Sequence, residues 1–375
     1  MSGAVIAGYV RSPFHFAGKG ALARVRPDDL CARVIAALVE RTGVPVDDLE
    51  DVIVGCAFPE AEQGLNLGRL VGLLAGLPQG AGGATVNRFC GSSMQGVHMA
   101  AGAIALGAGD VFVCAGVESM SRVPIMGFNP LPNPKLAAEL PGAYASMGVT
   151  AENVARRWEI GRDEQEALAL ASHAKAAAAQ EAGRFADELV PIDSVDADGC
   201  IRPDASSEGL AALQPAFDAA GTVTAGTSSP LTDGAAAVLV CSEAYAERHG
   251  LTPLAHIKAV AVAGCDPEIM GIGPVAASRK ALTRAGLNVA DLGVVELNEA
   301  FASQALACIR ELGLDPATIN LDGGAIALGH PLGATGARIT GKAAQLMRRE
   351  GARYGLATQC IGGGQGIATV LEALP

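Results

Sequence analysis

Four short stretches of this 375-residue sequence carry side chains suited to catalysis. Cys90 lies in VNRFCGSSMQG, His330 in NLDGGAIALGHPLGATGAR, Asn298 in VVELNEAFASQ and Cys360 in ATQCIGGGQGIATV. A thiolate is a strong nucleophile, an imidazole is a general base near neutral pH, and an amide can hold a water molecule or an oxyanion. These residue types, each beside a strand-like run or a glycine-rich turn, predict a site for nucleophilic catalysis.

Cys90 follows a β-like run, ATVNRF, and precedes an uncharged stretch at residues 91–107. We expect that stretch to be a helix buried on every side, because small and apolar residues occupy all of its faces. The first N–H groups of a helix lack partners within it, so a thiolate at this helix start would be stabilised and its pKa lowered. The alternative is an unreactive buried thiol, as many free cysteines are. Position alone leaves both interpretations open.

The other three candidates have weaker local signals. His330 lies in a turn built from glycines and a proline, where little side-chain bulk separates it from a substrate. Asn298 ends a strand-like run, although it could instead cap a helix at 301–313. Glycines 362–364 follow Cys360 and could point backbone N–H groups at an oxyanion. That run lacks the Lys and Ser/Thr of a P-loop, so it does not predict a nucleotide-phosphate site.

The elements that position these residues alternate between strand and helix. Residues 4–10, 51–58 and 110–117 are short, apolar and bounded by turn residues, which predicts buried strands. Residues 28–43 have apolar positions at helical spacing and end at a glycine. This alternation predicts an α/β fold with mostly parallel strands.

The sequence also contains an internal repeat. Residues 40–55 resemble residues 283–298, and Cys90 precedes His330 by nearly the same interval (330 − 90 = 240). Between the halves, Pro-rich turns, one clear helix and an acidic stretch indicate an insertion. The predicted parts are a first half (1–118 and 221–250), an inserted loop domain (119–220) and a second half (251–375).

Composition excludes several classes of function. The formal net charge of −12 argues against nucleic acid as a partner, because phosphate binding needs a basic surface. No apolar run reaches the roughly 20 residues of a membrane span. The nine cysteines form no CxxC pair, so we expect reduced thiols and neither a disulfide framework nor a metal site. With no targeting segment visible, we expect a cytoplasmic protein.

Eight stretches, spread over almost the whole chain, resemble the thiolase family. They are NRFCGSSMQG, AGVESMSR, MGVTAENVA, TVTAGTSSPLTDGAAA, GCDPEIMGIGP, LNEAFA, GGAIALGHPLGATGAR and CIGGGQG, and they occur in the family's order. The resemblance implies two similar α/β halves in a five-layer α-β-α-β-α arrangement, with a loop domain inserted in the first half. It also implies that coenzyme A is a substrate and that no cofactor is bound.

The implied activity is thiolytic cleavage of 3-ketoacyl-CoA to acetyl-CoA and a shortened acyl-CoA, reversible as a Claisen condensation. The resemblance implies that His330 deprotonates Cys90, which then carries the acyl group, while Cys360 protonates the acetyl-CoA enolate. One oxyanion site would consist of His330 and a water held by Asn298. The other would consist of the backbone N–H groups of Cys90 and Gly362. Such an enzyme is an acetyl-CoA C-acyltransferase.

Further residues and alternatives follow from the same resemblance. Ser229 matches a position that contacts the pantetheine arm, and Arg202 is a candidate for the nucleotide end of coenzyme A. CGSSMQ after the strand and Ser146, where short-chain members often carry His, favour the degradative 3-ketoacyl-CoA enzymes of fatty-acid β-oxidation. The alternatives are an acetoacetyl-CoA (acetyl-CoA C-acetyltransferase) enzyme, a ketoacyl synthase, which Cys360 disfavours, and a non-catalytic CoA- or lipid-binding protein.

The resemblance also carries expectations about assembly. We expect a homodimer, with a tetramer as the alternative, because the segment between residues 123 and 147 is short where family members carry oligomer-forming loops. A hydratase–dehydrogenase subunit is a further candidate partner.

Overall fold

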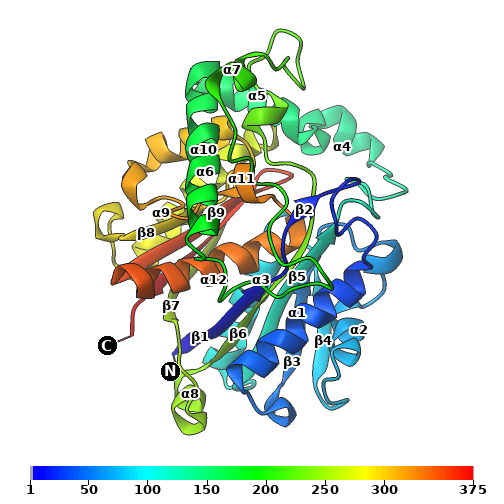
Figure 1. Ribbon diagram of the computed structural model, residues 1–375, viewed down its shortest axis with the longest axis vertical. Helices are drawn as coiled ribbons and strands as arrows, with labels where there is room; N and C mark the ends of the chain where they lie inside the picture. Colours follow the sequence, from blue (N-terminus) through cyan, green and yellow to red (C-terminus); the bar gives the residue numbers. More distant parts are fainter. Residues whose placement is uncertain (1–2, 375) are drawn as a thin grey trace.

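The computed structural model describes residues 3–374, which form an α/β fold around one ten-stranded sheet (Figure 1). The strands are β1 (Ala4–Arg11), β2 (His15–Phe16), β3 (Asp51–Gly55), β4 (Gly82–Val86), β5 (Val111–Ser119), β6 (Thr232–Ser242), β7 (Ala255–Gly264), β8 (Val294–Leu297), β9 (Tyr354–Ile361) and β10 (Gln365–Glu372). The helices are α1 (Pro27–Thr42), α2 (Leu67–Leu74), α3 (Ser92–Leu106), α4 (Pro134–Glu139), α5 (Met147–Arg157), α6 (Arg162–Glu181), α7 (Ser207–Ala211), α8 (Glu243–His249), α9 (Gly273–Ala285), α10 (Ala302–Leu312), α11 (Ala325–Leu328) and α12 (Leu332–Glu350).

The sheet consists of two similar parts joined at its middle. Its strand order is β4-β3-β5-β6-β1-β7-β10-β9-β8, with β2 paired to β6. The join between β1 and β7 is two residue pairs long, Val5 with His256 and Ile6 with Ala255. The first residues of β3 and β8 are separated by 294 − 51 = 243 positions, the interval of the sequence repeat. The repeat therefore corresponds to equivalent strands in two halves.

Most of the strand pairs run antiparallel, so the prediction of mostly parallel strands is wrong. Within the described residues, β3–β4, β3–β5 and β8–β9 are the parallel pairs. The strands β9 and β10 are joined by the three glycines at 362–364, and so short a connection can link only antiparallel neighbours. In the first half β1 and β5 both flank β6 and run antiparallel to it.

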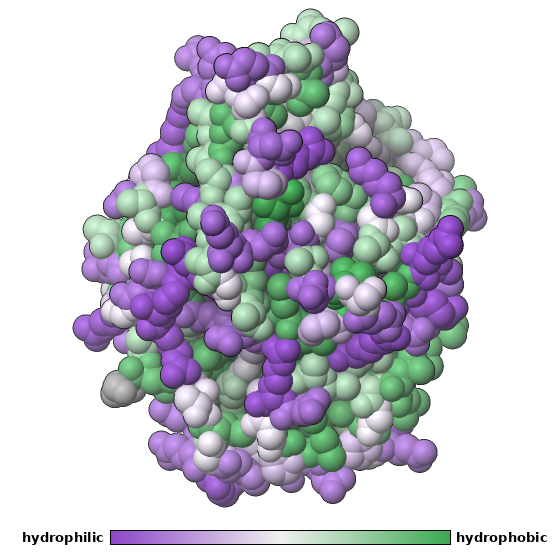
Figure 2. All heavy atoms as spheres, viewed as in Figure 1, coloured by the Kyte–Doolittle hydropathy of each residue, from purple (hydrophilic) through white to green (hydrophobic). Residues whose placement is uncertain are grey.

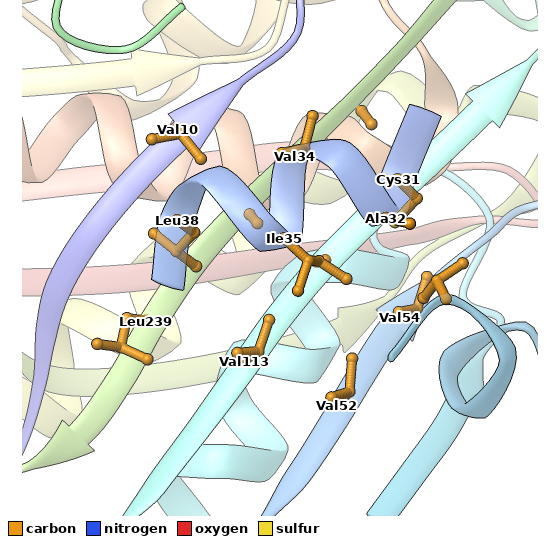
Figure 3. Packing of buried hydrophobic residues seen from close by; sticks show 14 of the residues in the cluster. Val10, Cys31, Ala32, Val34, Ile35, Leu38, Val52, Val54, Val113 and Leu239 are labelled. Atoms are coloured by element: carbon orange, nitrogen blue, oxygen red, sulfur yellow. The ribbon is translucent and has the colours of Figure 1, made fainter. Parts of the chain in front are cut away.

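Helices cover both faces of each part of the sheet and make five layers. Helix α1 packs its apolar side on β1, β3, β5 and β6, where residues such as Ile35 and Leu38 meet Val113 and Leu239 (Figure 3). Helices α3 and α12 lie between the two parts of the sheet and contact each other. Helices α9 and α10 cover the outer face of the second half. The order α-β-α-β-α matches the expectation from the family resemblance.

The two central helices differ in burial. Helix α12 is buried almost continuously from Gly333 to Met347. Helix α3 is buried at its start, but Met99 is 42% exposed and Leu106 is 86% exposed. The prediction that the 91–107 helix is buried on every side is therefore wrong, because one face of its second half lacks a covering element within residues 3–374.

Buried ion pairs fix the segment between β5 and β6 to both halves. Arg11 on β1 pairs with Glu188 and Asp198, each at 2.7 Å, and Lys342 on α12 pairs with Glu188 at 2.8 Å. All four side chains are buried, and removing one partner of such a pair leaves a costly unpaired charge. The segment carries α4 to α7, which lie in the upper part of the molecule in Figure 1.

Polar and apolar residues are mixed on the face of the molecule that Figure 2 shows. Figure 2 shows hydrophilic residues over much of the face seen in Figure 1, with apolar residues between them. Within residues 3–374, every helix is too short or too polar to span a bilayer.

Candidate active site

A cavity of about 490 Å³ brings together residues from both halves and from the inserted segment. Apolar side chains form most of its lining. Of the predicted site residues, the cavity is lined by Cys90, Ser229, His330, Cys360 and Gly362. Asn298 lies behind His330, and Arg202 lies in a neighbouring hollow. The structure thus gathers residues that are up to 272 positions apart in the chain (362 − 90 = 272).

Cys90 stands on a strained turn between β4 and α3. The preceding residue, Phe89, has a φ of 44°, which a bulky side chain rarely adopts. Ser92 fixes this turn, because its hydroxyl accepts from the Arg88 N–H at 2.9 Å and donates to the Phe89 carbonyl at 2.6 Å. Gly91 follows Cys90 and has no room for a side chain, since a Cβ would come within 2.6 Å of Ile361. The thiol is thereby held at the cavity, and Cys90 is half-buried.

Burial raises the pKa of the Cys90 thiol to about 11. Hydrogen bonds from the backbone N–H groups of Gly362 and of Cys90 itself lower the pKa, but by less than burial raises it. The prediction that the helix start lowers this pKa is therefore wrong for the free protein. Cys90 rests as a thiol, so a base must remove its proton before it can attack.

His330 lines the same cavity and is a candidate for that base. The residue is 4% exposed, and burial, followed by the charge of Arg338, lowers the pKa of its imidazole to about 3. The ring Nδ1 lies 2.6 Å from the Thr335 hydroxyl, which in turn donates to the Pro331 carbonyl at 3.1 Å. Because the single hydroxyl proton is used there, Nδ1 must donate to Thr335. The remaining nitrogen, Nε2, is then unprotonated and can accept a proton.

Asn298 holds the other side of the imidazole. Its Nδ2 lies 3.4 Å from His330 Nε2, and its backbone N–H donates to the Thr358 carbonyl at 3.0 Å. Helix α10 begins after Phe301 as its N-cap, so Asn298 is not the cap of this helix. The Asn298 Oδ1 atom is buried and has no protein partner among the described residues. That oxygen is free to bind a water molecule.

Cys360 lies near the end of β9, fully buried. Burial, followed by the charge of Cys90, raises its pKa well above the ordinary value, so it rests as a protonated thiol. The neighbouring Gln359 donates from Nε2 to the Cys90 carbonyl, which links β9 to the nucleophile's turn. The turn after β9 requires glycine at Gly364, where φ is 84° and a Cβ would meet the Cys265 carbonyl at 2.4 Å. This close fit positions the Gly362 N–H beside the Cys90 sulfur.

The two predicted coenzyme A contacts lie in separate hollows. Ser229 lines the main cavity, and its hydroxyl donates to the Ala300 carbonyl at 3.0 Å. Arg202 lines a second hollow of about 220 Å³ and lies over the ring of Phe16 at 5.4 Å. The two hollows share Pro230 as a wall. A ligand longer than the main cavity could therefore continue past Pro230 towards Arg202.

Two buried residues that support the site were not predicted. Thr335 sets the His330 tautomer, and Glu118 on β5 accepts from the N–H groups of Ala57 (2.8 Å), Phe58 (3.2 Å) and Gly333 (2.9 Å). Glu118 thus ties the first half to the start of the helix that follows His330. Glu118 could have been recognised from the sequence, because a glutamate is unusual in a strand as apolar as VFVCAGVES. Nothing in the local sequence distinguishes Thr335 from the other threonines. Among the described residues, no group of three or more His, Cys, Asp or Glu side chains could hold a metal ion.

Comparison with known protein families shows to which family the chain belongs. Residues 4–244 match the model of the thiolase N-terminal domain, and residues 251–373 match that of the thiolase C-terminal domain. The chain belongs to the thiolase family. Its thiolase relatives include the 3-ketoacyl-CoA thiolases of Bacillus subtilis (47% identical) and Shewanella frigidimarina (50% identical), in each case over 99% of this chain and 100% of the relative.

A solved thiolase structure shows the same fold. The crystal structure of human mitochondrial 3-ketoacyl-CoA thiolase has a TM-score of 0.92 and 38% sequence identity to this chain. The match covers 100% of this chain and 99% of the human chain. The five layers and the two halves described above are therefore the thiolase fold.

Proposed function

We propose that this protein is an acetyl-CoA C-acyltransferase that cleaves 3-ketoacyl-CoA with coenzyme A. The observation that carries the proposal is the meeting of Cys90, His330 and Cys360 in one cavity. Both relatives named above are called 3-ketoacyl-CoA thiolase, which supports the substrate class. A thiol nucleophile, an unprotonated imidazole and a second thiol are the groups that cleavage of a 3-ketoacyl thioester needs.

The first half-reaction begins at Cys90. His330 Nε2 takes the thiol proton, and the thiolate attacks the 3-keto carbon of the substrate. The C2–C3 bond then breaks, and its electron pair leaves with acetyl-CoA as an enolate. Cys360 donates its proton to the enolate carbon, which releases acetyl-CoA and leaves the shortened acyl group on Cys90.

The second half-reaction returns the enzyme to its resting state. Coenzyme A gives its thiol proton to Cys360 and attacks the acyl group on Cys90. Cys90 leaves as a thiolate and takes back the proton held by His330. Run in reverse, the same steps form a C–C bond by Claisen condensation.

Two sets of donors stabilise the negative charge of these steps. The N–H groups of Cys90 and Gly362 already donate towards the Cys90 sulfur and would serve the oxyanion that forms beside it. His330 and a water on the free oxygen of Asn298 would serve the enolate oxygen of acetyl-CoA.

Coenzyme A would extend from the main cavity into the second hollow. Ser229 in the main cavity would contact the pantetheine arm, and Arg202 in the second hollow would supply positive charge for the nucleotide end. Pro230, which borders both hollows, supports this path.

The alternative function is synthesis of acetoacetyl-CoA from two molecules of acetyl-CoA. The same catalytic residues would perform it. The large, mostly apolar cavity favours longer acyl chains over an acetoacetyl group. We therefore place cleavage of longer 3-ketoacyl-CoA first.

We propose a homodimer formed through the free edge of β4. This strand ends the sheet, so one side of its backbone has no neighbour within residues 3–374. Helices α2 and α3 flank this edge and expose apolar residues beside it, namely Leu70, Leu73, Met99 and Leu106. A second copy could pair along β4 and cover these side chains.

Two further predictions concern the location of the protein in the cell and a partner protein. We propose a reducing, cytoplasmic location, which is supported by nine cysteines that are all unpaired. The hydratase–dehydrogenase partner stays a prediction.

A Cys360→Ala variant tests the division of labour between the two thiols. We expect Cys90 of this variant to accept an acyl group from an acyl-CoA donor, detected by intact-protein and peptide mass spectrometry. Exchange of the acetyl-CoA α-protons with solvent deuterium should fall by about 100-fold or more, because the acid–base group for that carbon is gone. Unchanged exchange, or no acyl adduct on Cys90 of the unaltered protein, would contradict the mechanism.

A further inference from the structure

One side of the cavity is covered by a segment that follows β5. Residues 123–146, here called the cover segment, contribute several of the lining residues, and these are apolar or aromatic. They are Ile125, Met126, Pro130, Leu131, Pro132, Ala143, Tyr144 and Ala145. Residues 57–60 also line the cavity, and Glu60 adjoins the cover segment. Because these side chains are apolar, this part of the lining is suited to contact with an acyl chain.

Glu60 anchors the cover segment at this wall. Its Oε2 accepts from the Phe128 N–H at 2.7 Å. The turn before Phe128 needs a glycine, because Gly127 has a φ of 76° and a Cβ there would lie 2.1 Å from Glu60 Oε1. Two residues further on, Glu62 pairs with Arg122, the residue that precedes the cover segment. Both ends of residues 122–128 are thereby fixed to the loop that follows β3.

The described lining of the cavity carries one negative charge and no positive charge to compensate it. Glu60 is the single carboxylate among the described lining residues, and that lining includes no Lys or Arg. The nearby arginines are engaged elsewhere, since Arg122 pairs with Glu62 and Arg88 donates to Gln365 at 2.7 Å. A second carboxylate placed beside Glu60 among these apolar side chains would meet a like charge, with no cation in the described lining to compensate it.

We propose that Glu60 is a specificity-determining residue that rejects acyl chains ending in a carboxylate. The substrates are then 3-ketoacyl-CoA thioesters with uncharged aliphatic chains, and dicarboxylic chains are excluded. This inference rests on the proposed thiolytic function and adds the chemical class of the chain. The apolar cover segment supplies contact with the methylene groups, and Glu60 supplies the repulsion.

A matched pair of substrates isolates the effect of charge. 3-Ketohexanoyl-CoA and 3-ketoadipyl-CoA have the same six-carbon chain and differ in the terminal carboxylate. In the unaltered protein we expect kcat/KM for the hexanoyl substrate to exceed that for the adipyl substrate by about tenfold or more. Glu60→Gln, which keeps an acceptor for Phe128, should reduce this ratio several-fold by raising the adipyl value. Glu139→Gln, on the exposed α4 of the same segment, is the control and should leave the ratio unchanged.

A second variant keeps the test valid if Glu60→Gln does not fold. Leu131 lines the same side of the cavity and is 83% exposed, so Leu131→Arg adds a cation without touching Glu60. It should raise the adipyl kcat/KM by about tenfold and lower the hexanoyl value. Equal kcat/KM for both substrates in the unaltered protein, or an unchanged ratio in either folded variant, would overturn the role of Glu60. Absence of thiolysis with both substrates in the unaltered protein would instead overturn the proposed function, and this inference with it.

Discussion

The turns that carry Cys90 and His330 occupy corresponding places in the two halves, yet their surroundings differ. Each precedes a central helix, and the two helices begin 240 residues apart (332 − 92 = 240). Cys90 is half-buried, and the helix behind it exposes apolar residues. His330 is almost fully buried, and the helix behind it holds charged residues in internal ion pairs, such as Arg338 with Glu296 at 3.1 Å.

This difference shows how one repeated scaffold supports two chemical roles. The first half presents a thiol to the cavity, and the second half keeps an imidazole in one tautomer between Thr335 and Asn298. Burial drives both groups towards their neutral forms, because it raises the pKa of Cys90 and lowers that of His330. The resting pair is therefore a neutral thiol beside a neutral base.

Removing the thiol of Cys90 tests the role of the first half and should have the largest effect on activity. We expect Cys90→Ser to lower kcat for thiolysis by at least about 10⁴-fold, because a serine hydroxyl is a far weaker nucleophile at neutral pH. Binding of a CoA thioester, measured by calorimetry, should persist. Cys265→Ser is the matched control, since Cys265 is also half-buried but does not line the cavity. Turnover near the original rate in Cys90→Ser would contradict the assignment of the nucleophile.

Removing the hydrogen-bond partner of His330 tests the role of the second half. Thr335→Val keeps the shape of the side chain but removes the partner of His330 Nδ1, so the tautomer is no longer fixed. Leaving a buried donor unpaired corresponds to about a tenfold loss of kcat. Thr340→Val on the same helix is the control, because that hydroxyl bonds only to the Gly336 carbonyl at 2.7 Å. Equal losses in the two variants would show that Thr335 has no special role.

The exposed face of α3 gives a third way to sharpen the comparison. If a second copy covers it, Leu106→Glu should weaken the dimer and reduce the mass measured by light scattering by up to about twofold. Val149→Glu, at an exposed apolar position on α5 in the inserted segment, should leave the mass unchanged. A monomeric unaltered protein, or an unaffected dimer in Leu106→Glu, would contradict the proposed interface.

The pH profile should show the smallest effect. Transfer needs one proton on the Cys90–His330 pair, and His330 gains a second proton only as the pH falls through about 3. The pair loses its proton only as the pH rises through about 11. Ionisation of these two groups should therefore change kcat/KM by less than about twofold between about pH 5 and about pH 9. An inflection near the ordinary histidine value, about 6.5, would show that His330 is not held neutral by burial.

Much of the site could be predicted because its residues lie in distinctive local sequence. Cys90, His330 and Cys360 each sit beside glycines that the backbone requires, and the resemblance to the thiolase family covers all of them. Asn298 was predicted as a site residue or a helix cap, and the structure excludes the cap. Thr335 was missed because its role depends on the tautomer of a residue five positions earlier, which local sequence does not encode.

Long-range packing explains the other errors. The pKa of Cys90 was expected to fall because a helix start is a local feature, whereas the burial that raises the pKa is created by the surrounding chain. The exposed face of α3 has the composition of a buried helix, so hydropathy alone could not distinguish a core face from a surface that a second copy would cover. The antiparallel strands were missed because composition does not report strand direction.

The pairing of β1 with β6 has a consequence for synthesis of the protein. Ala4 is the partner of Ser242, so β1 has no neighbour on that side until 238 further residues (242 − 4 = 238) have been made. At the usual speed of ribosomes that wait lasts roughly 10 to 50 seconds, during which a strand of apolar residues is without its native partner. The first half therefore cannot complete its sheet until the inserted segment has left the ribosome, and the nascent chain becomes a candidate for chaperone protection at its N-terminal end.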